Sequence, residues 1–73
     1  MNISDYAARV RRLRQDETLM MVFADIKDDA VQVFSNPNST PEKILEAHSS
    51  IQAIGTLERK FDSIEGDARI KEQ

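Results

Sequence analysis

SNPNSTPE, residues 35–42, is the stretch of sequence that decides how this chain folds. A proline disfavours the α conformation in the residue before it, and asparagine and serine compete for backbone hydrogen bonds, so a helix must end near Asn36. Thr40-Pro41-Glu42 then restarts a helix, because threonine is a favoured N-cap, proline fits the first helical position and glutamate suits the positive end of the helix dipole. The sequence therefore predicts a turn over residues 36–40 between two helices, which should pack antiparallel because the connection is short.

Before this turn, apolar residues recur every three or four positions and predict a first long helix over residues 17–35. Asp16 is a suitable N-cap, and Glu17 would place a negative charge in the first turn. The apolar face expected to meet the second helix consists of Leu19, Val22, Phe23, Ile26, Ala30, Val33 and Phe34.

The second long helix is predicted over residues 41–64, with an apolar stripe that continues along its whole length. Gly55 lies inside this helix at a cost of about 1 kcal/mol relative to alanine, which indicates either close approach of a neighbouring backbone or simple tolerance. Gly66 followed by Asp67 is typical of a helix stop, so a frayed polar tail is expected over residues 66–73. The stripe consists of Ile44, Ala47, Ile51, Ile54, Leu57, Phe61 and Ile64.

At the start of the chain, Ser4 or Asp5 can cap a short amphipathic helix over residues 4–15. The fold class is therefore all-α: a single domain, residues 1–73, formed by an antiparallel helical hairpin preceded by a short amphipathic N-terminal helix. The apolar stripe of the short helix consists of Ile3, Tyr6, Val10 and Leu13.

Charge is unevenly distributed along the chain, whose net charge is −3. The first helix carries four arginines that flank its apolar stripe and could contact an anionic partner; a solvated helix face is the alternative. The first long helix carries an acidic face that could imitate nucleic acid or hold a cation weakly; again a solvated face is the alternative. The basic set is Arg9, Arg11, Arg12 and Arg14, and the acidic set is Asp25, Asp28 and Asp29.

A chain of 73 residues buries only about 60% of the surface that its unfolded form exposes, so its core is marginal. Because it has no cysteine, disulfides and thiolate metal sites are excluded. Self-association or docking on a larger protein is then the remaining route to extra stability. The longest apolar run, LMMVFA at residues 19–24, is far shorter than a membrane span. Residues 1–5 lack the positive start and the apolar stretch that are typical of a secretory signal. We therefore expect the host cytoplasm or a virion, and neither secretion nor a membrane.

Catalytic chemistry has little support in this sequence. His48 is the only histidine, and a general base would need an orienting carboxylate and a concave site, so we expect a half-buried structural side chain. No glycine-rich segment predicts a phosphate loop or a dinucleotide site. A narrow hairpin also lacks the enclosed pocket that small-molecule chemistry requires. We therefore expect no cofactor, no metal, no small-molecule substrate and no enzymatic activity.

The order of these features resembles that of a family of small, functionally uncharacterised helical phage and prophage proteins encoded near packaging and portal genes. The likeness spans about residues 9–71 and departs at Glu17, where that family often has proline. It implies a role in virion assembly or DNA packaging and supplies no catalytic residues. The matching segments are Asp16-Glu17, Phe23-Ala24-Asp25-Ile26-Lys27-Asp28-Asp29-Ala30, Ser39-Thr40-Pro41-Glu42, His48-Ser49-Ser50-Ile51-Gln52-Ala53-Ile54 and Leu57-Glu58-Arg59.

The leading hypothesis is a phage interaction protein that self-associates or docks on a larger virion or packaging component. Met20, Ala24 and Val31 make the apolar face of the first long helix wider than one partner helix requires. The extra width favours a contact with another subunit, although a broad core face is an ordinary alternative. The other hypotheses are a small phage inhibitor that binds a host protein through the acidic face, and an accessory DNA binder that uses the arginines. The interface candidates are Tyr6, Val10, Leu13, Met20, Ala24 and Val31.

Overall fold

The structure, a computed structural model, describes residues 2–72, with the side chains of residues 2–70. It contains the helices α1 (Ile3–Arg14), α2 (Glu17–Ser35) and α3 (Pro41–Glu72), and no strand within the described residues. The prediction of an all-α protein is confirmed.

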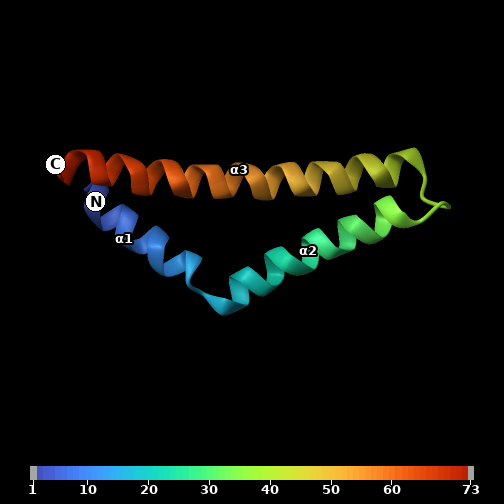
Figure 1. Ribbon diagram of the computed structural model, residues 1–73, viewed down its shortest axis with the longest axis horizontal. Helices are drawn as coiled ribbons and strands as arrows, with labels where there is room; N and C mark the ends of the chain where they lie inside the picture. The colour runs from blue at the N-terminus through green and yellow to red at the C-terminus, as the bar shows by residue number, and fades with distance from the viewer. Residues whose placement is uncertain (1, 73) are drawn as a thin grey trace.

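The long helix α3 runs the whole length of the molecule, and α1 and α2 follow one another along it (Figure 1). They meet at a bend that points away from α3, so the three axes outline a flat triangle. The molecule measures 52 × 21 × 17 Å, and its radius of gyration is 16.0 Å. A compact domain of this length would have a radius of gyration of about 11 Å. The chain is therefore elongated, and much of each helix faces solvent.

The bend between α1 and α2 is made by a single residue outside the α region. Asp16 has φ −71° and ψ 114°, which is extended backbone. Its carboxylate accepts a hydrogen bond from the backbone N–H of Leu19 at 2.9 Å, which satisfies one of the free donors at the start of α2. Asp16 is thus the N-cap that the sequence predicts, and α2 has the predicted bounds.

Side chains close both helix ends at the turn before α3. The Ser39 hydroxyl donates a hydrogen bond to the Val33 carbonyl at 2.7 Å, in the last turn of α2. The Thr40 hydroxyl accepts one from the backbone N–H of Lys43 at 3.2 Å, in the first turn of α3. Thr40 is therefore the N-cap predicted for the second long helix.

The start and the packing face of α1 differ from the prediction. Asn2 is the N-cap, not Ser4 or Asp5, because its side chain accepts the hydrogen bond of the Asp5 N–H at 2.9 Å. The packing face also differs, since Ala7 is 1% exposed whereas Tyr6 is 44% and Leu13 45% exposed. An alanine in the contact lets the two helix backbones approach closely, and this rotates the larger side chains outward.

The predicted end of α3 is wrong, because the helix continues through Gly66 to Glu72. Ile64 and Ala68 are buried against Ala7 and Val10 of α1, with Ile3 and Phe61 packed around them. The burial of Ile64 and Ala68 against α1 offsets the low helix propensity of Gly66. Residues 66–72 are thus helical, and Ala68 among them is packed against α1, while residue 73 of the predicted tail lies outside the described residues.

The contact between α2 and α3 is narrower than the sequence predicts. Its fully buried members are Ala30 of α2 with Ala47 and Ile54 of α3, and no large side chain among the described residues is completely buried. Several residues assigned to the facing stripes are instead exposed by two fifths or more of their surface. These residues are Val22, Phe34, Ile44 and Leu57.

Replacement of Gly66 by alanine tests the continuous helix. Apart from the neighbouring backbone of its own helix, no described heavy atom lies within 4 Å of the position that a Cβ would occupy at Gly66. We expect Gly66→Ala to raise the free energy of unfolding by about 1 kcal/mol, because alanine has the higher helix propensity. Urea unfolding followed by circular dichroism measures this change.

Gly55→Ala is the matched control, since both glycines are helical but a Cβ at Gly55 would lie 3.3 Å from the guanidinium of Arg59. We expect a smaller gain there, because the arginine must move. If Gly66→Ala left stability unchanged or lowered it, α3 would end near residue 66 after all.

Candidate protein-interaction surface

Helix α2 carries two parallel rows of residues that alternate at spacings of four and three. The first row faces α3 and consists of Leu19, Phe23, Ile26, Ala30 and Val33. The second row is displaced from the first by one residue, about 100° around the helix. We call it the second seam, and it consists of Met20, Ala24, Lys27, Val31 and Phe34.

Every residue of the second seam is exposed in the isolated chain. Met20 is 37%, Phe34 49% and Val31 56% exposed. A four-three repeat is the pattern by which one helix packs along another, and here none of the three described helices covers it. The predicted interface residues Met20, Ala24 and Val31 all lie on this seam. Lys27 and Phe34 were missed, although the same spacing would have identified them.

A cavity opens beside the N-terminal half of the second seam. It has a volume of about 370 Å³ and lies where the bend carries α1 and α2 away from α3. Apolar side chains from α2 and α3 line it, and charged side chains complete its wall. The lining residues are Arg14, Met20, Phe23, Ala24, Lys27, Glu58 and Phe61.

One ion pair ties the second seam to the adjacent flank of α3, where the Lys27 Nζ lies 3.1 Å from the Glu58 Oε1. His48 was expected to be half-buried, but it is exposed, because the contact between α2 and α3 is too narrow to reach it. Of the two alternatives for Gly55, simple tolerance fits the structure and close approach of a backbone does not: outside its own helix backbone, the Arg59 side chain is the one described group within 4 Å of its Cβ position.

Two of the four arginines form ion pairs with α3, although the Arg11 side chain remains 58% exposed. The Arg14 guanidinium forms ion pairs with Asp62 at 2.9 Å and with Glu65, and Arg11 lies 3.4 Å from Glu65. Hydrogen bonds to Asp62 and then to Glu65 raise the pKa of Arg14 above its ordinary value. Arg14 also lies 5.8 Å from the centre of the Phe61 ring. These two cations therefore hold α1 on α3 and are not free for an anionic partner.

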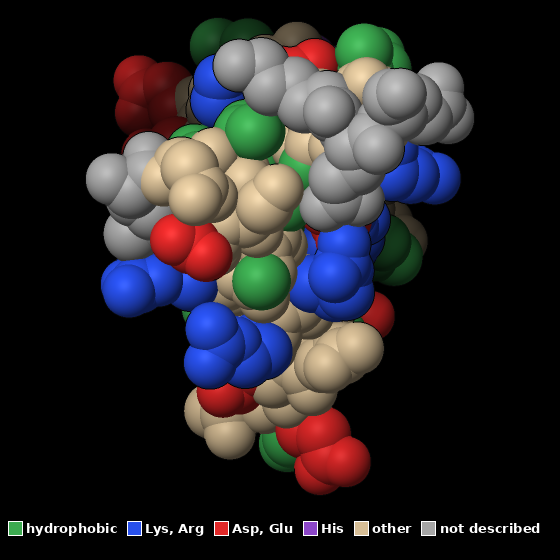
Figure 2. All heavy atoms as spheres, turned by 90° about the vertical axis from the view of Figure 1, so that its left-hand side faces the viewer, with side chains coloured by type: hydrophobic (Ala, Val, Ile, Leu, Met, Phe, Trp, Pro, Cys, Tyr) green, Lys and Arg blue, Asp and Glu red, His purple; other side chains and the backbone are tan. Residues whose placement is uncertain are grey.

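Arg9 and Arg12 remain exposed and line a shallow surface hollow on α1. Figure 2 views this end of the molecule and shows Lys and Arg side chains on both sides, with hydrophobic side chains only as separate spots. Tyr6 and Leu13 are exposed on α1, whereas the third candidate there, Val10, is 5% exposed and packs in the core. Val10 is thus not available to a partner.

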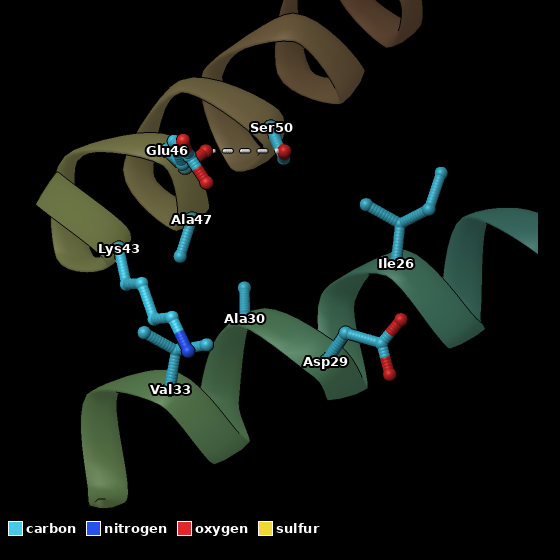
Figure 3. Close-up of a pocket in the computed structure, with 8 residues that line it drawn as sticks. All are labelled: Ile26, Asp29, Ala30, Val33, Lys43, Glu46, Ala47 and Ser50. Carbon is cyan, nitrogen blue, oxygen red and sulfur yellow. Dashed lines mark hydrogen bonds between the residues drawn. The ribbon is translucent and has the colours of Figure 1, made fainter. Parts of the chain in front are cut away.

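The three aspartates do not form one compact site. Asp25, Asp28 and Asp29 are all exposed, but Asp28 falls about 160° around α2 from the buried Ala30 at roughly 100° per residue. Asp29 instead lies at the edge of an open groove of about 420 Å³ between α2 and α3 (Figure 3). Ala30 points into this groove, whose other lining residues are Ile26, Val33, Lys43, Glu46, Ala47 and Ser50.

The described part of the chain holds no group of three or more His, Cys, Asp or Glu side chains placed to bind a metal ion. Over the same residues, none of the three helices combines the length and the apolar character needed to cross a bilayer.

Comparisons with protein-family models, with curated proteins and with solved structures find no match to this chain.

Substitution of Glu65 tests whether the arginines of α1 act within the chain. Glu65→Gln removes the carboxylate that Arg11 and Arg14 share. We expect the amide hydrogens of α1 to exchange several-fold faster in this variant, because α1 would leave α3 more often. Hydrogen exchange resolved by residue measures this change.

The control is Glu58→Gln, which removes the partner of Lys27 on α2 and should leave the exchange of α1 unchanged. Equal acceleration in both variants, or none with Glu65→Gln, would mean that these ion pairs do not hold α1 in place.

Proposed function

We propose that the chain is a non-enzymatic interaction protein that self-associates or docks on a larger assembly component. The observation that carries this proposal is the second seam of α2, a regular helix-packing row that stays exposed within the described residues. Exposed apolar rows of this kind are typical of surfaces that bind another helix.

The exposed area of the whole molecule supports the same proposal. The chain exposes 5721 Å², about 1,100 Å² more than a compact monomer of its mass would expose. A stable interface takes about 800 Å² from each partner. The excess is therefore as large as the surface that one partner commonly contributes.

The kind of assembly is proposed from the resemblance to small phage and prophage proteins. On that basis the larger component would belong to a virion or to the DNA-packaging machinery, and the protein would act in the host cytoplasm or in the particle. The four-three spacing of the second seam suits docking on another helical protein.

The alternative functions have less support in the geometry. An accessory DNA binder would use the four arginines, but Arg11 and Arg14 are already paired with carboxylates of α3. An inhibitor that imitates nucleic acid would use the aspartates as one row, but Asp28 and Asp29 differ by about 100° around α2.

Site-specific photocrosslinking tests the proposed function in cells that produce the protein. A photoreactive phenylalanine analogue at Val31 would lie on the second seam, while the same analogue at Gln32 would lie about 100° away on an exposed face. We expect the label at position 31, and not at position 32, to form a discrete adduct with this chain itself or with a virion or packaging protein.

Mass spectrometry identifies the adduct. The proposal is wrong if the label at position 31 forms no protein adduct, or if both positions label the same broad set of proteins.

A further inference from the structure

The second seam has a pattern that fits a second copy of itself. Lys27 lies at its centre, with Met20 seven residues before it and Phe34 seven residues after it. Ala24 and Val31 occupy the intermediate positions on the two sides of Lys27. If two such seams met in antiparallel orientation, Met20 would lie opposite Phe34, and the small Ala24 would lie opposite the larger Val31. At each pair of facing positions, a large side chain would then meet a small or a flexible one.

The charge at the centre of the seam is also compatible with a second copy. Each Lys27 already has Glu58 as its partner at 3.1 Å. Two copies related by a two-fold axis near Lys27 would bring two lysines and two glutamates together, with a balanced charge. A polar residue at one position of an apolar seam restricts the register of the two helices, because every other register would leave it facing apolar side chains.

The cavity at the bend gives the antiparallel arrangement a specific contact. Met20 and Ala24 form part of its wall, together with Phe23 and Phe61. In the antiparallel pairing the Phe34 side chain of the second copy would lie opposite Met20, at the mouth of this cavity. A ring that is 49% exposed in one copy would then enter a cavity of about 370 Å³ in the other and contact the apolar part of its wall.

From these three observations we infer that the chain forms a two-fold symmetric dimer, in which the second seams of two α2 helices pack antiparallel and Phe34 of each copy enters the bend cavity of the other. The inference rests on the proposed interaction function and names its partner. The surface in excess of a compact monomer, about 1,100 Å², is sufficient for the area of about 800 Å² that a stable dimer takes from each copy.

Solution mass across a concentration series, measured by sedimentation equilibrium of the full chain, tests the dimer. We expect twice the mass of the 8.3 kDa chain at the upper concentrations. Val31→Glu should raise the dissociation constant by at least about tenfold, because it replaces an apolar contact with a carboxylate whose nearest cation, Lys27, is already paired with Glu58. Circular dichroism checks that the variant remains helical, which we expect because Val31 is 56% exposed in the monomer.

Met21→Glu is the matched control, since Met21 is 66% exposed and lies about 100° around α2 from the seam. It should change the dissociation constant by less than about threefold, or less than 1 kcal/mol. A helical monomer at all concentrations would overturn the inference, and so would a dimer that is weakened by Met21→Glu but not by Val31→Glu.

Disulfide trapping tests the orientation, and the chain suits this method because it contains no cysteine. We expect a mixture of Met20→Cys and Phe34→Cys chains to form a mixed disulfide on mild oxidation, because these positions meet in the antiparallel pairing. Each variant alone should remain largely uncrosslinked. Efficient crosslinking of Met20→Cys with itself would indicate a parallel seam and overturn the arrangement.

The outcomes separate this inference from the proposed function. A purified monomer whose position 31 still crosslinks to a virion or packaging protein in cells would overturn the dimer and leave the interaction function in place. A monomer whose position 31 crosslinks to nothing would overturn both.

Discussion

The contact of α1 and α2 with a single shared helix is the constraint on which the rest of this structure depends. α1 and α2 barely touch each other, and each is positioned by its own stretch of α3. Near one end Ala7 and Val10 pack on Ile64 and Ala68, and near the other Ala30 packs close to Ala47. Because α3 is straight, the change of direction at Asp16 carries α1 and α2 away from α3 at the bend, and the cavity of about 370 Å³ lies beside it.

Small side chains in these contacts explain why so much apolar surface remains outside. Four of the seven residues that are buried in the described part of the chain are alanines, and alanine brings helix backbones close together while burying little area of its own. The larger side chains nearby are then displaced to the flanks of the contact. The second seam of α2 is one result of this displacement, and the cavity at the bend is another.

Ion pairs help to hold α1 on α3, because the apolar contact between these two helices is small. The guanidinium of Arg14 reaches Asp62 and Glu65 across the contact and lies against the Phe61 ring. A helix of 12 residues is marginal in water without such tertiary support. Two of the four arginines that the sequence offers to an anionic partner are thus paired with carboxylates of the same chain.

The sequence by itself determined the local features: the cap at Asp16, the turn before Pro41 and the spacing of both rows on α2. These depend on backbone conformation and on periodicity, which neighbouring residues specify. Only the tertiary structure decided that Ala7 and not Tyr6 faces α3, and that the last helix passes through Gly66. Burial of Ile64 and Ala68 against a segment more than fifty residues away supplies the free energy for both outcomes, and no local pattern contains that contact.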